Sequence, residues 1–309
     1  MILTITMNPS IDVSYPLTEF SLDAVNRVKN VKKTVGGKGL NVTRILKQLD
    51  AEVMASGLIG GVLGEEIKER LTQDNILHEF LSIKSETRNC IAILHEGQQT
   101  EILESGPIVS TQEASDFLNH LGKLAVKADV ICFSGSLPQG LPIDFYQQMI
   151  QVCRPKPVML DCSGEALMTV LKGESKPYLI KPNIQELAEL LDQPITTDVK
   201  QLKVALSDPL FAGIDWVVVS MGRKGAFAKH SNRFYHVMIP SIKAVNPVGS
   251  GDAMLAAGLA VAIEKEKSVD VVLKQGNALG ILNAQEETTG YIELVNYHTL
   301  IKQIQIKEV

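Results

Sequence analysis

The sequence reads Asn246-Pro247-Val248-Gly249-Ser250-Gly251-Asp252-Ala253 directly before an apolar run, Ala253 to Ile263, that predicts a helix. Small residues let a backbone approach a ligand closely, and the first amides of a helix have no intrahelical partner, so together they favour an anion. Asp252 at the edge of such a site has the chemistry to take a proton from a hydroxyl that attacks a phosphoryl group. A glycine turn is also a common helix start, so the octapeptide alone leaves both interpretations open.

Outward from this octapeptide, apolar strand-like runs alternate with amphipathic segments. Helical spacing of apolar residues follows Val42 and again Leu187. Buried strands separated by helices indicate an α/β fold in which helices cover both faces of a mostly parallel sheet. The predicted strands are Ile2 to Met7, Val53 to Ile59, Val130 to Ser134, Val158 to Asp161, Tyr178 to Lys181 and Trp216 to Ser220.

Two regions interrupt this alternation with short strand-like segments and turns, Ile11 to Thr34 and Ile76 to Leu103. They predict a small separate sheet inserted between βα units, which is a candidate lid. The sequence contains no repeat, low-complexity tract or Pro/Gly-rich linker. We therefore expect one α/β domain over residues 1–309, with a β lid formed from about 11–34 and 76–108.

The composition, 45% hydrophobic and 21% charged, is that of an ordinary globular protein, and the formal charge of −5 gives no reason to expect nucleic acid or a membrane as partner. No apolar run approaches the ~20 residues that span a bilayer. The segment Met1 to Met7 lacks a basic flank and a cleavage site, so it predicts a strand. The spacing of the four cysteines fits neither a metal site nor a paired disulfide framework: Cys90, Cys132, Cys153 and Cys162. We therefore expect them to be reduced thiols, which suits the cytoplasm.

A second glycine cluster, Gly36-Gly37-Lys38-Gly39-Leu40-Asn41, precedes the helix predicted from Val42. Gly-Gly permits close approach to a ligand, Lys38 offers a positive charge, and Asn41 offers both a donor and an acceptor. The spacing matches neither a Walker loop nor a dinucleotide fingerprint. The alternative is a plain glycine turn with Lys38 in solvent.

Three further segments follow predicted strands. Lys181-Pro182-Asn183-Ile184-Gln185-Glu186 places Asn183 and Glu186 on one face of a first helical turn, where they could hold Mg²⁺ through its water shell or form a capping box. Ser220-Met221-Gly222-Arg223-Lys224-Gly225 could pass nucleotide phosphates or be a simple hairpin. Ser134-Gly135-Ser136-Leu137-Pro138 ends a strand where open α/β sheets bind ligands.

Together these segments resemble the ribokinase-like sugar kinases, the family often named after its minor phosphofructokinase, over essentially the whole chain. The resemblance implies a three-layer α/β/α sandwich with a small β-sheet lid. Four more stretches resemble the branch that acts on ketohexose phosphates. They are Met7-Asn8-Pro9-Ser10-Ile11-Asp12, Glu86-Thr87-Arg88-Asn89-Cys90, Ser134-Gly135-Ser136-Leu137-Pro138 and Asp161-Cys162-Ser163-Gly164.

The resemblance implies phosphoryl transfer from ATP, with Mg²⁺, to a sugar 1-hydroxyl. Asp252, with an ordinary carboxylate pKa near ~4, would act as base, and amides around Gly249, Ser250 and Gly251 would stabilise the moving phosphoryl group. The sugar phosphate would be held by Asp12, Gly36, Gly37, Lys38, Asn41, Arg88, Ser136 and Arg27. The nucleotide would be contacted by Lys181, Asn183, Glu186, Ser220, Gly222, Gly225 and Asn277, with Mg²⁺ near Asn183 and Glu186.

Arg27 is equally well explained as an exposed surface arginine or as a contribution from a neighbouring subunit. Within the branch, the spelling of Asn246 to Asp252 and the segment Asn89 to Pro107 favour tagatose 6-phosphate over fructose 1-phosphate or fructose 6-phosphate. A catalytically silent sensor would need a damaged base, whereas Asp252 is intact. One departure from the family is Asn246-Pro247, where relatives usually have Asp-Thr beside a monovalent cation, so we expect weak or no dependence on K⁺.

A lid over such a site would exclude water before transfer, and pairing its exposed strand edges across two subunits would give a homodimer.

Overall fold

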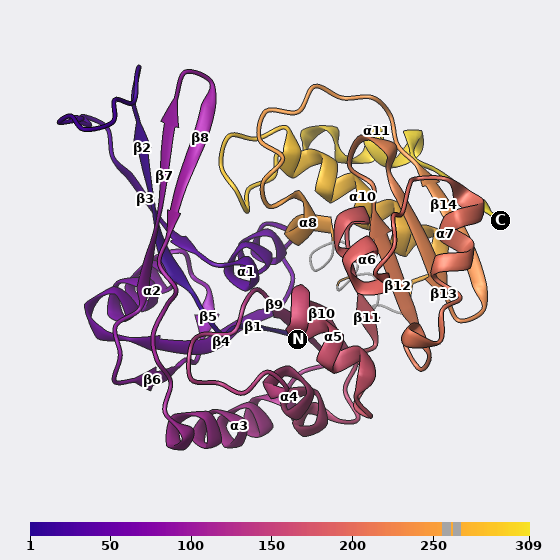
Figure 1. Ribbon diagram of the computed structural model, residues 1–309, viewed down its shortest axis with the longest axis horizontal. Helices are drawn as coiled ribbons and strands as arrows, with labels where there is room; N and C mark the ends of the chain where they lie inside the picture. The colour runs from indigo at the N-terminus through magenta and orange to yellow at the C-terminus, as the bar shows by residue number, and fades with distance from the viewer. Residues whose placement is uncertain (255–260, 262–266) are drawn as a thin grey trace.

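A computed structural model of the chain describes residues 1–254, 261 and 267–309. Its centre is a large twisted sheet with strand order β15-β14-β13-β12-β11-β10-β9-β1-β4-β5 (Figure 1). The parallel strands are β1 (Ile2–Thr6), β4 (Val53–Gly60), β9 (Val130–Ser134), β10 (Val158–Asp161), β11 (Leu179–Ile180) and β12 (Trp216–Ser220). An antiparallel extension consists of β13 (Ala226–His230), β14 (Arg233–Met238) and β15 (Gln305–Glu308).

Helices cover both faces because successive side chains of a strand point to opposite sides. Within β9, Ile131 and Phe133 join one apolar cluster, whereas Cys132 joins the other. The first cluster includes α3 (Thr111–Ala125), α4 (Phe145–Cys153), α5 (Gly164–Lys172), α6 (Ile184–Leu191) and α7 (Val199–Ala205). The second includes α1 (Lys38–Gln48), α10 (Val269–Ala284) and α11 (Tyr297–Gln303). This is the expected ribokinase-like sandwich of three layers.

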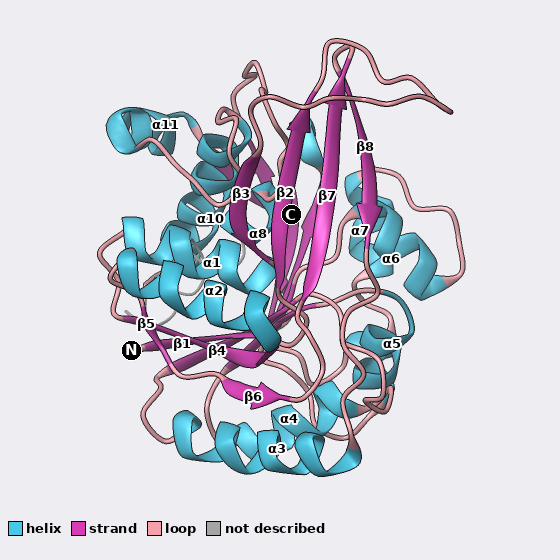
Figure 2. Ribbon diagram, turned by 90° about the vertical axis from the view of Figure 1, so that its left-hand side faces the viewer, coloured by secondary structure: helices cyan, strands magenta, loops and turns pink. Residues whose placement is uncertain are grey.

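A small sheet stands away from the large one and has the order β3-β2-β7-β8 (Figure 2). A third apolar cluster, which includes Ile11, Val35 and Ile67, joins its base to α2 (Gly61–Gln73). The four strands are β2 (Ser10–Pro16), β3 (Lys32–Gly36), β7 (Arg88–His95) and β8 (Gln98–Leu103).

The predicted second lid segment, 76–108, begins too early. Strands β5 (Leu77–His78) and β6 (Leu81–Ile83) pair in parallel with β4 and so extend the large sheet. The reason is burial, since Ile76 and Ile83 carry apolar side chains into the core beside β4. The small sheet therefore takes up the part of this segment that starts at Arg88.

Two other features bear on the sequence expectations. The helix predicted from Ala253 to Ile263 begins with α8 (Ser250–Asp252), but most of that apolar run lies outside the described residues. In the part of the chain that the structure describes, no helix is long and apolar enough to cross a bilayer.

Candidate active site

The glycine-rich segment before α8 forms a cradle of backbone amides. Gly249 is the N-cap, with a φ of 80° that disfavours other residues. A Cβ on Gly249 would lie 2.4 Å from Cγ2 of Thr289, so the loop from 285 to 290 packs directly against this turn. The amide of Ser250 already donates to the Pro247 carbonyl at 3.2 Å. Because the next amides of a first turn lack intrahelical acceptors, those of Gly251 and Asp252 are the donors for an anion.

Asp252 is buried at the end of this turn, and its carboxylate contacts the early glycine cluster. Nδ2 of Asn41 donates to its Oδ2 at 2.9 Å. Desolvation, and then the nearby carboxylate of Asp161, raises the pKa of Asp252 to about 6, while Lys38 and Asn41 oppose the rise. The expectation of an ordinary carboxylate pKa was therefore wrong, because sequence alone does not reveal burial. At neutral pH most of the carboxylate is still ionised and can accept a proton.

Two lysines converge on a second buried carboxylate, that of Asp161 at the end of β10. Nζ of Lys38 lies 3.8 Å from its Oδ2, and Nζ of Lys181 lies 4.0 Å from its Oδ1. Asp161 raises the pKa of Lys38, which keeps this ammonium charged. A Cβ on Gly251 would lie 3.0 Å from Nζ of Lys181, so that ammonium is adjacent to the cradle. The cradle thus has positive charge close to where a phosphoryl group would bind.

The early glycine cluster, Gly36 to Asn41, lies where the small sheet meets α1. Gly36 ends β3, and a Cβ there would lie 2.0 Å from Oδ1 of Asp12, so only glycine leaves room for that carboxylate. Ser10 donates its hydroxyl to Asp12 at 2.6 Å. Burial raises the pKa of Asp12, against the effects of Ser10 and two arginines. The predicted sugar-binding pair of Asp12 and the Gly36-Gly37 backbone is therefore together in space.

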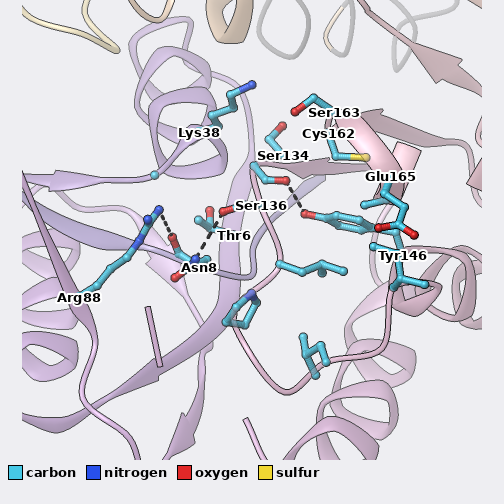
Figure 3. A pocket seen from close by; sticks show the side chains of 17 residues that line it. Thr6, Asn8, Lys38, Arg88, Ser134, Ser136, Tyr146, Cys162, Ser163 and Glu165 are labelled. Atoms are coloured by element: carbon cyan, nitrogen blue, oxygen red, sulfur yellow. Dashed lines mark hydrogen bonds between the residues drawn. The ribbon is translucent and has the colours of Figure 1, made fainter. Parts of the chain in front are cut away.

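A cavity of about 580 Å³ opens between the small sheet and the ends of β1, β9 and β10 (Figure 3). Lys38, Arg88 and Ser136 all line it, as the sequence interpretation requires. Arg88 donates to the carbonyls of Glu104 at 2.9 Å and Asn8 at 3.1 Å, which fixes the guanidinium at the cavity wall. These donors suit a dianion.

The segments predicted to contact nucleotide lie side by side at the ends of β11 and β12. Asn183 and Ser220 form a parallel bridge, and the Ser220 amide donates to the Pro182 carbonyl at 3.0 Å. Asn183 and Glu186 form the capping box that was the alternative to metal binding, with reciprocal bonds of 2.9 Å. Gly222 and Gly225 lie in the hairpin that joins β12 to β13, so the hairpin interpretation also holds.

Neither Asn277 nor Arg27 is among the residues that line the cavity. Asn277 is buried in α10, where its Nδ2 donates to the Leu273 carbonyl at 2.9 Å. Arg27 is exposed in the loop between β2 and β3 and does not line the cavity. Their ligand contacts therefore stay predictions.

Comparisons with known proteins show the family of the chain. The family of pfkB carbohydrate kinases matches residues 5–294. The chain belongs to this family. A candidate phosphofructokinase from Staphylococcus aureus is 30% identical with a TM-score of 0.85, over 100% of this chain and 99% of that chain. Phosphofructokinase-2 from Escherichia coli, solved in complex with potassium, is 25% identical with a TM-score of 0.88, over 97% of this chain and 98% of that chain.

A candidate 1-phosphofructokinase from Thermotoga maritima is 24% identical with a TM-score of 0.88, over 100% of this chain and 99% of that chain, and supports the fold. As a pfkB family member with this site, the protein is a sugar-phosphate kinase.

Sequence reasoning missed several contributors to its site. Asp161 was noticed only as part of a motif, although a carboxylate at the end of a buried strand is a usable signal. Four more cavity residues, Asn8, Ser134, Cys162 and Ser163, were likewise noticed only within quoted motifs, whereas Thr6 and Tyr146 were missed.

Proposed function

We propose that this pfkB family kinase transfers the γ-phosphoryl group of ATP to the 1-hydroxyl of D-tagatose 6-phosphate, giving D-tagatose 1,6-bisphosphate, and so acts as a tagatose-6-phosphate kinase in lactose and galactose-6-phosphate catabolism. The observation that carries the proposal is the buried Asp252 carboxylate beside the glycine-rich turn at Gly249, where the amides of Gly251 and Asp252 begin α8. A carboxylate that is ionised at neutral pH can accept the hydroxyl proton as the phosphoryl group moves.

The cavity supports binding of the substrate's own phosphate. Arg88 and Lys38 bring positive charge, and Ser136 brings a hydroxyl. Nδ2 of Asn8 lies 3.4 Å from Oγ of Ser136 and occupies an acceptor site on that oxygen, which favours donation of the Ser136 proton into the cavity. Asp12 and the Gly36-Gly37 backbone would hold the sugar hydroxyls, so that the 1-hydroxyl points toward Asp252.

ATP would bind with its γ-phosphoryl group at the cradle, where Lys181 and the amides of Gly251 and Asp252 offset developing charge. Among the described residues, no group of three or more His, Cys, Asp or Glu side chains could hold a metal by itself. Mg²⁺ would arrive with ATP and be held mainly by its phosphates, with its water shell near Glu186 and Asn183, whose side chains already form the capping box. Such an ion would neutralise phosphate charge, while the chain's own residues position the reactants.

Fructose 1-phosphate and fructose 6-phosphate are the alternative acceptors, and the similar solved structures include phosphofructokinases. The orientation of one hydroxyl separates tagatose from fructose 6-phosphate, so the test is kinetic. We expect kcat/KM, measured as ADP release, to be at least about tenfold higher with tagatose 6-phosphate. A higher kcat/KM with either fructose phosphate would reassign the substrate while leaving the kinase assignment intact.

We predict weak dependence on K⁺. Nδ2 of Asn246 donates to the Glu287 carbonyl at 3.1 Å, and its Oδ1 accepts from the Val248 amide at 3.0 Å. The first bond joins the loop before the cradle to the loop that packs behind it, a task that a cation could otherwise perform, and the second braces the loop before the cradle. Replacing Na⁺ by K⁺ at constant ionic strength should change kcat less than about twofold, an energy difference under ~0.5 kcal/mol. A large activation by K⁺ would overturn this prediction.

We propose that the small sheet closes over the sugar before transfer and pairs with that of a second subunit. Strand β8 is exposed along its length, and it carries the exposed apolar side chains Ile102 and Leu103. Sedimentation velocity tests this pairing, since wild type should be dimeric and Ile102→Glu should shift toward monomer.

The buried thiols Cys153 and Cys162 suit the cytoplasm, where we place the enzyme.

A further inference from the structure

We propose that Arg44 is a positioning residue for phosphoryl transfer, because it fixes the orientation of the Asn41 amide that holds Asp252. This inference rests on the proposed function. Arg44 lies one helical turn after Asn41 in α1, and its guanidinium is partly buried beneath the site. Its Nη2 donates to Oδ1 of Asn41 at 2.6 Å.

Hydrogen-bond polarity gives this contact its effect. A guanidinium only donates, so Asn41 must turn its oxygen toward Arg44 and its NH₂ toward the acceptor, the Asp252 carboxylate. The resulting chain runs from Arg44 to Oδ1 of Asn41, and from Nδ2 of Asn41 to Oδ2 of Asp252 at 2.9 Å. The flipped amide would set NH₂ against guanidinium and oxygen against carboxylate. With Oδ2 of Asp252 held in this way, Oδ1 is presented to the sugar hydroxyl.

The same guanidinium joins the other parts of the site. Nη1 of Arg44 donates to the Val35 carbonyl, directly before Gly36, and Nη2 also donates to the Thr289 carbonyl at 3.2 Å. Thr289 packs on Gly249 of the cradle. One arginine therefore contacts the sugar-binding loop, the residue that holds the base, and the loop behind the amide cradle.

The charged groups around the Arg44–Asn41–Asp252 hydrogen bonds determine in which direction loss of Arg44 shifts the pKa of Asp252. Burial lowers the pKa of Arg44, while the carboxylates of Asp12, Asp74 and Asp252 oppose that change. The bond from Asn41 lowers the pKa of Asp252, as do Lys38 and Lys181, whereas Asp161 raises it. When the Asn41 amide is free to rotate, that bond weakens and the pKa of Asp252 rises. The acid limb of the kcat profile then moves to higher pH.

The test compares kcat against pH for wild type and Arg44→Met, with ATP and the best sugar phosphate saturating. We expect kcat to fall about tenfold or more and the acid limb to move up by roughly one pH unit, the size of one lost hydrogen bond to a charged group. Substrate phosphates also titrate near pH 6, but they do so with both enzymes, so the difference isolates the protein.

Arg70→Met is the matched control. Arg70 also donates to a carbonyl of β3, that of Lys33, but it lies on α2 and makes its other bond to Glu66. The acid limb of the kcat profile of Arg70→Met should coincide with that of wild type. In a second comparison, Asn41→Ala and the double variant Asn41→Ala/Arg44→Met should share one acid limb. An unmoved limb in folded Arg44→Met, or additive shifts in the double variant, would overturn the proposal.

Two further measurements keep the outcome clear. If Arg44→Met does not fold, Arg44→Lys replaces it, because an ammonium retains the charge but lacks the planar fork whose two nitrogens reach Val35 on one side and Asn41 and Thr289 on the other. The pKa of Asp252 can also be obtained without catalysis, from the pH dependence of the stability difference caused by Asp252→Asn with and without Arg44→Met. If no sugar phosphate is phosphorylated by wild type, the proposed function fails. An unchanged pKa of Asp252 in that stability measurement would overturn the role of Arg44 by itself.

Discussion

The Asp252→Asn variant is expected to release ADP between about 10² and 10⁴ times more slowly than wild type, the range for losing a general base. The same variant should be more stable than wild type at pH 8. Burial raises the pKa of Asp252 to about 6, so ionising this group in the folded protein is unfavourable. An asparagine removes that cost and can still accept from Asn41.

The sign of the pH dependence follows from the raised pKa. Below pH ~4 the carboxyl is protonated in both folded and unfolded states, so the two proteins should be about equally stable. As the pH rises from the unfolded pKa near ~4 to the folded pKa of about 6, wild type loses relative stability, and the variant leads by about 2–3 kcal/mol above pH 7. Urea unfolding at four pH values measures this difference. Asp50→Asn, the same change on an exposed residue, serves as the control and should leave turnover unchanged.

The Gly249→Ala variant is expected to lower kcat by about 10²-fold or more and to destabilise the fold by about 1–3 kcal/mol. Its φ of 80° strains any residue with a Cβ, and that Cβ would lie 2.4 Å from Cγ2 of Thr289. Relieving the clash must shift the cradle or the loop behind it, which would misalign the amides proposed to stabilise the moving phosphoryl group.

Gly97→Ala separates strain from misalignment. Gly97 also has a positive φ, 73°, but no atom lies within 4 Å of its added Cβ. This control should lose a similar amount of stability to backbone strain while keeping kcat. Full activity in a folded Gly249→Ala variant would contradict the role assigned to the cradle.

The sheet and the two glycine-rich turns were predictable because they depend on local patterns. An apolar run such as Trp216 to Ser220 predicts a buried strand by itself. A turn whose backbone must approach a ligand closely requires glycine, and glycine is visible in the sequence. The contacts of Asp252 with Asn41 and of Thr289 with Gly249 join segments far apart in sequence, so the sequence pattern did not reveal them.

The sequence also could not predict the direction of the hydrogen bonds at Asn41 or the burial of Asp252. Arg44 lies within the helix predicted from Val42 and was given no role there, although its side chain contacts three segments of the site. Asn41 was predicted to bind sugar, and its NH₂ in fact faces Asp252. The raised pKa of Asp252 depends on desolvation by the folded chain, which local sequence does not encode.

The fate of the γ-phosphoryl group tests the account most directly. Wild type would be mixed with ATP labelled in that group and with tagatose 6-phosphate, then quenched within one turnover and its products separated. We predict that the label appears on the sugar 1-oxygen, with one ADP formed per bisphosphate. Label recovered as inorganic phosphate with the sugar unchanged would contradict the account, because water rather than a hydroxyl facing Asp252 would then be the acceptor.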